Sequence, residues 1–172
     1  MRELMPNPRG LKDMEKATKR VLEAVTGLQK IAIFADYDVD GGASAALLLT
    51  WLRNFQADAT LYIPDRIDEG YGPNETAMAQ LAKKNDLIIC VDCGTLSHGP
   101  ISAAIGADVV VLDHHLGTEQ LPDAFAIVNP NRQDENGTLT HLCAAAVVFL
   151  MLVEAGRQLR TVGENEPNLM NM

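Results

Sequence analysis

The chain has no apolar run long enough to cross a bilayer, which takes about 20 residues. Residues 1–20 alternate charged and apolar side chains and lack the continuous apolar segment of a secretory signal. Cysteine is scarce, with three residues, so a framework of paired disulfides is not indicated. Cys90 and Cys93 have C-x-x-C spacing, but no second pair completes a zinc site. These absences predict a cytoplasmic globular protein without a membrane segment.

Basic side chains are also few. Lys and Arg number 14 against 23 Asp and Glu, which gives the 172 residues a formal net charge of −9. Nucleic-acid affinity depends mainly on basic side chains that displace counterions, so this balance argues against a general polyanion-binding surface. The acidic balance says less about nucleic-acid binding if part of the negative charge surrounds divalent cations, because bound cations would cancel that part.

The content of 47% hydrophobic and 22% charged residues fits one soluble domain, and no internal repeat is present. Short apolar runs that predict strands alternate with segments of helical periodicity. The predicted strands are 31–34, 59–63, 87–91, 108–112 and 126–128, and the predicted helices are 11–25, 43–55, 75–84, 100–105 and 139–159. This alternation indicates an α/β fold with a mostly parallel sheet and helices on both faces.

Acidic and imidazole side chains directly follow three of the predicted strands. The residues are Asp36, Asp38 and Asp40 after the first strand, Asp92 after 87–91, and Asp113, His114 and His115 after 108–112. The carboxyl ends of parallel strands share one edge of the sheet, so these groups should converge. Carboxylates that crowd together repel one another unless cations lie among them. The pattern therefore predicts a metal site.

The first cluster places carboxylates at alternate positions, which face the same way if the segment is extended. Gly41 and Gly42 then allow a sharp turn into a helix, whose free N–H groups can receive a phosphate oxygen. A calcium loop of the EF-hand type is not favoured, because Leu47 stands where that loop needs Glu. A solvated acidic turn remains an alternative for this segment alone, and a turn or helix cap remains one for Asp92 alone.

The two adjacent histidines can serve one site only where a strand gives way to a turn, which Gly117 suggests. Imidazole binds first-row divalent metals, and a neighbouring carboxylate can orient the ring by accepting its other N–H. Several carboxylates with one or two imidazoles favour manganese or magnesium over a structural zinc site.

These motifs, in this order, resemble those of the DHH phosphoesterase superfamily. The motifs are Asp-Tyr-Asp-Val-Asp-Gly at 36–41, Val-Asp-Cys-Gly at 91–94 and Asp-His-His at 113–115. The flanking segments 62–66, 69–72, 128–132 and 141–145 are similar to those of the RecJ-type single-strand-specific exonucleases. The resemblance runs from about residue 4 to residue 159.

The resemblance implies metal-dependent hydrolysis of phosphodiester bonds in single-stranded DNA, in the 5′-to-3′ direction. It implies a two-metal site for Mn²⁺ or Mg²⁺ that is bound by Asp38, Asp40, Asp92 and His114. Asp92 is the candidate to bridge both ions. Further assignments by resemblance are His115 as a ligand or phosphate contact, and Asp36 and Asp113 as ligands or as groups close behind the ligands. Arg66 and Arg132, in loops just beyond strand ends, are expected to contact phosphates, and a surface ion pair is the alternative for either one.

The family also has a further acidic ligand after the long helix and a second domain over the nucleic acid, neither of which occurs in the 172 residues. We therefore expect an N-terminal helical segment at 1–28, a catalytic lobe at 29–160 and a tail at 161–172 that leads to an absent remainder. Two alternatives stay open: a small-molecule DHH phosphoesterase acting on pyrophosphate, oligonucleotides or cyclic dinucleotides, and a non-catalytic interaction module. Protein partners are not indicated.

Overall fold

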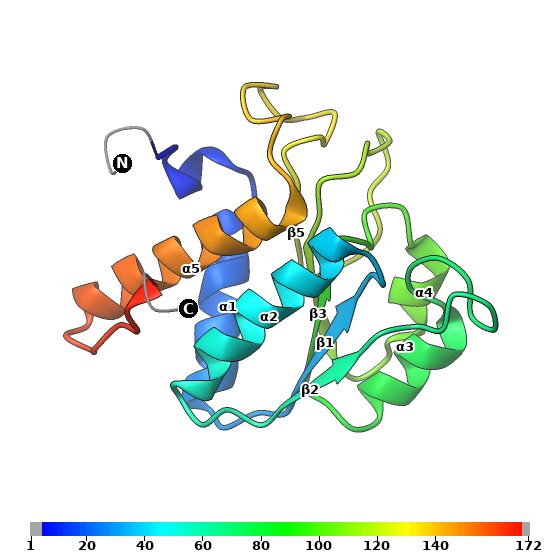
Figure 1. The fold of residues 1–172 in the computed structure, drawn as a ribbon, viewed down its shortest axis with the longest axis horizontal. Helices are drawn as coiled ribbons and strands as arrows, with labels where there is room; N and C mark the ends of the chain where they lie inside the picture. The colour runs from blue at the N-terminus through cyan, green and yellow to red at the C-terminus, as the bar shows by residue number, and fades with distance from the viewer. Residues whose placement is uncertain (1–4, 170–172) are drawn as a thin grey trace.

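The computed structural model describes residues 5–169, and its centre is one five-stranded sheet in which all strands are parallel (Figure 1). The strands are β1 (Ile31–Ala35), β2 (Ala59–Tyr62), β3 (Leu87–Val91), β4 (Asp108–Leu112) and β5 (Ala126–Val128), in the spatial order β2-β1-β3-β4-β5. The predicted α/β fold is confirmed, and each strand lies within one residue of its predicted bounds at either end. The ends of the first and last predicted segments, residues 1–4 and 170–172, lie outside the described residues.

Helices cover both faces of the sheet, as predicted (Figure 1). One face packs against α1, α2 and α5, and the other packs against α3 and α4. A short 3-10 turn, η2 (Pro8–Gly10), precedes them; the helices are α1 (Met14–Thr26), α2 (Val39–Arg53), α3 (Glu75–Ala82), α4 (His98–Ala103) and α5 (Ala144–Thr161). Helix α1 shares the core of α2 and α5, so it packs as part of the same body.

The central strands are apolar throughout because both of their faces are buried. In β1, Ile31 and Ile33 face the core of α1, α2 and α5, whereas Ala32 and Phe34 face the core of α3 and α4. Successive side chains alternate in this way along each strand. Helices on the two faces therefore leave the strand ends as the place where polar side chains can gather.

The strand order reverses beside β1. The chain passes from β1 to β2 at one edge, and then crosses to β3 on the other side of β1. In open parallel sheets, ligands bind in the crevice beyond the carboxyl ends of the strands where this reversal occurs. Asp36 follows β1 and Asp92 follows β3, so the first two acidic clusters flank the reversal.

Helix α2 begins at Val39, four residues before the predicted start. Asp38 is its N-cap, and the Oδ1 atom of Asp38 accepts a hydrogen bond from the Gly41 amide at 2.9 Å. The predicted extended acidic segment is therefore wrong beyond Asp38, because Asp40 lies in the first helical turn. Gly41 serves close packing rather than a turn, since an added Cβ would overlap the carbonyl oxygen of Asp36.

Helix α5 begins at Ala144, five residues after its predicted start. Its N-cap, Cys143, makes no side-chain capping hydrogen bond. The first two amides of the helix are instead bonded to the side chain of Asp40, which lies in α2. A contact between segments far apart in the sequence thus fixes where this helix starts.

No helix among residues 5–169 is long and apolar enough to cross a membrane. The cysteines Cys90 and Cys93 are buried, Cys143 is exposed, and all three are free thiols.

The two adjacent glycines of α2 offer a matched test of this packing. Gly41→Ala should lower the free energy of unfolding by about 1–3 kcal/mol, because the new methyl group is forced against the Asp36 backbone. Gly42→Ala should raise it by roughly 0.5–1 kcal/mol, since its Cβ meets open space and alanine favours the helix. Urea unfolding measures both. Equal effects of the two substitutions would contradict the close approach at Gly41.

Candidate metal centre

The carboxylate of Asp92 lies at the centre of the site. Asp92 follows β3 directly, has the left-handed φ of 60° and is 1% exposed. Neither of its carboxylate oxygens has a hydrogen-bond partner among the residues that the structure describes. Buried polar groups are nearly always paired, and a non-glycine residue at positive φ is strained. A charged group in such a position suits a bound cation.

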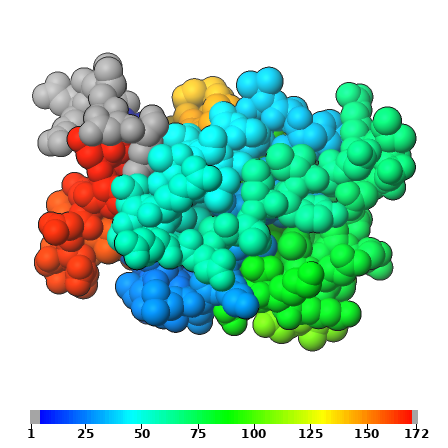
Figure 2. All heavy atoms as spheres, turned by 60° about the horizontal axis from the view of Figure 1, so that its bottom comes forward, coloured from blue at the N-terminus to red at the C-terminus, as the bar shows by residue number. Residues whose placement is uncertain are grey.

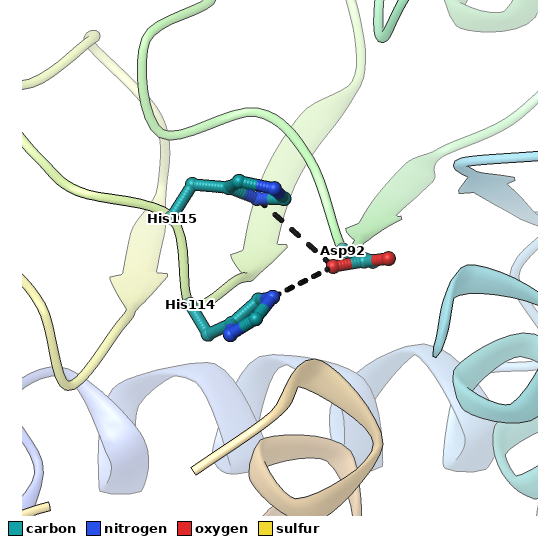
Figure 3. Close-up of side chains that lie close together, drawn as sticks. All are labelled: Asp92, His114 and His115. Atoms are coloured by element: carbon teal, nitrogen blue, oxygen red, sulfur yellow. Dashed lines mark ion pairs between the residues drawn. The ribbon is translucent and has the colours of Figure 1, made fainter. Parts of the chain in front are cut away.

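Both adjacent histidines direct their rings toward Asp92 (Figure 3). The Nε2 atom of His114 lies 3.3 Å from Asp92 Oδ1, and the Nδ1 atom of His115 lies 4.0 Å from the same oxygen. The chain leaves β4 at Leu112 and turns at once, so the two rings are not forced to opposite faces. The rings of both histidines therefore lie near the same carboxylate.

Two groups of possible ligand atoms meet at Asp92. The atoms of Asp36, Asp38 and Asp92 lie within 4.8 Å of one another, and so do those of Asp92, His114 and His115. The carboxylate of Asp36 is therefore near enough to Asp38 and Asp92 to bind the same ion, which is one of the two roles that the resemblance implies for it. Oxygen-rich groups with imidazole suit manganese or magnesium.

Burial and mutual repulsion disfavour the negative charge of two of these carboxylates. Burial, followed by the interactions with Asp38 and Asp40, raises the pKa of Asp92 to about 8. Burial also raises the pKa of Asp36, and one of its carboxylate oxygens is buried without a partner. Divalent cations would remove this repulsion and supply the absent partners, so the residues present fit such ions.

Asp113 braces the turn that carries the histidines. Its Oδ1 atom accepts hydrogen bonds from the amides of His114 at 2.7 Å and His115 at 3.2 Å, and the Nδ1 atom of His115 lies 2.8 Å from it. Its Oδ2 atom accepts one from the Thr95 amide at 3.0 Å. Burial opposes ionisation, but these bonds prevail and lower the pKa of Asp113 to about 2. Asp113 therefore orients the histidines.

Asn129 and Asn131 hold the same turn from the side of β5. The buried Asn129 amide donates to Thr95 Oγ1 and to the carbonyl oxygen of His115, both at 2.8 Å. The Asn131 side chain donates to the carbonyl oxygen of His114. Neither residue was predicted at the site from the sequence. The Asn-Pro-Asn segment directly after a predicted strand was the available signal.

Asp40 approaches the site from α2. Its Oδ2 atom lies 3.6 Å from His114 Nε2 and accepts a hydrogen bond from the Ala144 amide at 2.7 Å. Its Oδ1 atom accepts one from the Ala145 amide at 2.9 Å. Asp40 thus lies next to the predicted ligand His114. The first two amides of α5 hold the Asp40 carboxylate in this place.

The two predicted phosphate contacts have different surroundings. Arg66 is exposed, and its guanidinium lies 5.5 Å from the ring centroid of Tyr37. Tyr37 in turn meets Tyr71 edge-on, and the Tyr71 hydroxyl lies 3.1 Å from His115 Nε2. Arg66 therefore belongs to an aromatic rim that reaches the site. Figure 2 shows the segment between β2 and α3, which carries Arg66, projecting from the molecular surface.

Arg132 is 9% exposed at its side chain and is held by other partners. Its guanidinium bonds to Asp13 at 3.0 Å, to both oxygens of Asp134 at 2.9 and 3.0 Å, and to the carbonyl oxygen of Ile127 at 2.6 Å. This geometry favours a structural role that links α1, β5 and the following loop. It gives no support to the predicted phosphate contact.

The raised pKa of Asp92 predicts that the free energy of unfolding of the metal-free chain depends on pH. The folded state keeps a proton on Asp92 between pH about 4 and 8 that the unfolded state releases, so stability falls as pH rises through this window. Asp92→Asn has no such loss. In EDTA, the stability of the variant relative to the original chain should increase from pH 5 to pH 8 by as much as about 4 kcal/mol. Urea unfolding at several pH values measures it, and a difference independent of pH would contradict the unpaired carboxylate.

Comparison with known proteins identifies the family. The model of the "DHH family, N-terminal domain" matches residues 30–171. The single-stranded-DNA-specific exonuclease RecJ of Bacillus subtilis is 36% identical over 146 residues, which cover 83% of this chain and 19% of that protein. The protein of the same name from Dickeya dadantii is 35% identical and covers 100% of this chain and 33% of that protein. The chain thus spans about a fifth to a third of the length of these relatives.

Solved structures support the same assignment. A crystal structure of exonuclease RecJ bound to manganese has a TM-score of 0.78 and 29% identity, covering 91% of this chain and 40% of that chain. RecJ from Thermus thermophilus in complex with Mn²⁺ has a TM-score of 0.73 and 26% identity, covering 91% of this chain and 22% of that chain. The resemblance to RecJ-type exonucleases that the sequence predicts is confirmed. From its matched model, its relatives and its fold, the chain belongs to the DHH family.

Proposed function

We propose that this chain carries the metal site of a nuclease that hydrolyses phosphodiester bonds in single-stranded DNA from the 5′ end. The observation that carries the proposal is the buried Asp92 carboxylate, which has no hydrogen-bond partner and lies among acidic and imidazole groups. The substrate rests on similarity to RecJ proteins, which are named as single-stranded-DNA-specific exonucleases. The direction rests on the resemblance of the sequence motifs alone. The proposed compartment is the cytoplasm, where free thiols such as the three in this chain persist.

The residues would hold two divalent cations, Mn²⁺ or Mg²⁺, that share Asp92. Asp36, Asp38 and Asp92 would bind one ion, and Asp40, Asp92 and His114 the other. Two bound ions lower the pKa of a water nucleophile and stabilise the charge that develops on the attacking and leaving oxygens. Of the two roles that the resemblance implies for Asp36, this proposal takes that of a ligand.

His115 has the geometry of a phosphate contact. Asp113 fixes its Nδ1 atom at 2.8 Å, which leaves Nε2 directed toward the Tyr71 hydroxyl at the rim of the site. The hydrogen bond that His115 Nδ1 donates to the Asp113 carboxylate raises the pKa of His115, so its ring can carry a proton and donate from Nε2 to a phosphate oxygen. Tyr37 and Tyr71 at the same rim offer faces on which bases of a single strand can stack.

Activity should depend on the named ligands. With manganese, the chain should release nucleotides from 5′-labelled single-stranded DNA slowly compared with the Bacillus subtilis relative, because net charge −9 gives few phosphate contacts. Asp38→Asn and His114→Ala should each reduce that release by at least about 100-fold, since a two-metal site fails when one ion is misplaced. Gel analysis of the labelled products measures both.

Asp123→Asn is the matched control, because it removes an exposed carboxylate just before β5, at the other end of that strand from the site. It should keep the original rate. Release that is equal in Asp38→Asn, His114→Ala and Asp123→Asn would contradict the proposed function.

Arg66 offers a separate test of DNA binding. Arg66→Ala should weaken single-stranded DNA binding and reduce the slope of log affinity against log salt by about 0.7, because one phosphate contact is lost. Fluorescence anisotropy in calcium-containing buffer, at several salt concentrations, measures the slope. Arg53→Ala removes an exposed arginine at the last residue of α2 and should leave the slope unchanged. The same slope in both variants would remove Arg66 from the DNA path.

A further inference from the structure

The start of α5 is tied to the candidate metal centre through one side chain. Asp40 accepts a hydrogen bond from the Ala144 amide at Oδ2, at 2.7 Å, and one from the Ala145 amide at Oδ1, at 2.9 Å. The same Oδ2 atom lies 3.6 Å from His114 Nε2. Two helices therefore meet at one carboxylate, and that carboxylate borders the site.

These hydrogen bonds leave Asp40 able to bind a cation. A carboxylate oxygen has more than one lone pair, so each oxygen can accept an amide proton and still face a metal ion. The N-terminus of the 18-residue helix α5 also attracts the negative group through its dipole. Two amides that bond both oxygens fix the orientation of the carboxylate as well as its position.

An independent observation indicates where the carboxylate points. His114 Nε2 lies between Asp40 and Asp92, at 3.6 Å from one and 3.3 Å from the other. Asp92 is 1% exposed, and both of its oxygens lack a hydrogen-bond partner among the described residues. Three groups that bind divalent cations thus surround one position, and α5 holds one of them there.

We infer that the backbone amides of Ala144 and Ala145 are positioning groups of the metal centre, which hold Asp40 in its ligating orientation. This inference rests on the proposed function, because it assigns Asp40 to the metal. Partners of this kind behind metal ligands typically change metal affinity by 10–100-fold when they are removed. If Asp40 serves only as a helix cap, the loss of an amide would change stability and leave metal affinity as it was.

Ala144→Pro removes one of the two donors. Ala144 is the first residue of α5, where proline is tolerated, and Cys143 before it has the extended conformation that proline requires, with φ −82° and ψ 168°. The variant should fold and should bind Mn²⁺ about 10-fold or more weakly than the original chain. Isothermal titration of each chain with Mn²⁺ measures the affinity.

A second variant separates the lost donor from the added proline ring. Replacement of Ala144 by lactic acid exchanges the N–H for an ester oxygen and adds no bulk. The matched control is the same replacement at Ala146, whose amide bonds to the carbonyl oxygen of Cys143 within the helix. Both esters remove one helix amide, but only the ester at Ala144 should weaken Mn²⁺ binding.

The background variant Asp40→Ala shows whether the effect passes through Asp40. In that background, Ala144→Pro should cause no further loss of Mn²⁺ affinity. Equal affinity of the original chain and the Ala144 variants would overturn the inference, and so would an undiminished loss in the Asp40→Ala background. Failure of the original chain to bind Mn²⁺ would instead overturn the proposed function.

Discussion

The buried carboxylate of Asp92 is the constraint on which the rest of the site depends. It lies between the ends of β1 and β4, at positive φ, in a place where burial and neighbouring carboxylates both disfavour its charge. A fold does not keep such a group for stability, because a buried carboxylate without a hydrogen-bond partner costs free energy. The arrangement becomes favourable when a cation binds, and it therefore connects the topology of the sheet to the chemistry of the site.

The surrounding structure is rigid where the proposed chemistry needs it to be. Three parallel strands end side by side and supply the acidic and imidazole groups, and the hydrogen bonds of Asp113, Asn129 and Asn131 fix the turn after β4. Sites of this kind require the ligands to be held by further partners. The acidic net charge is compatible with a nucleic-acid substrate, since part of it is concentrated where cations are proposed to bind.

Much of this could be predicted from the sequence because it depends on local patterns. Apolar runs identified every strand, and the residues that follow Ala35, Val91 and Leu112 identified the edge at which the site lies. The start of α5 could not be predicted, because an apolar segment has the same periodicity on both sides of Ala144. The first amide of the helix, that of Ala144, donates its hydrogen bond to Asp40, 104 residues away in the sequence.

The partners of Arg132 could not be predicted for a similar reason. Arg132 follows a strand, where a side chain can contact the substrate. Its guanidinium instead donates hydrogen bonds to Asp13, 119 residues away, and to the neighbouring Asp134. Position along the chain predicts which edge of the sheet a side chain occupies. It does not predict whether that side chain forms an ion pair with another residue of the chain. Arg66 and Arg132 therefore have similar positions in the sequence but different partners in the structure.

The central claim is that Asp92 is shared by two divalent cations, and anomalous X-ray scattering from crystals soaked in manganese tests it most directly. The account predicts two peaks within ligand distance of Asp92, one toward Asp36 and Asp38 and the other toward His114 and Asp40. A single peak on one side would contradict the sharing of Asp92 by two ions. The absence of any peak at this edge of the sheet, with manganese bound elsewhere, would contradict the account.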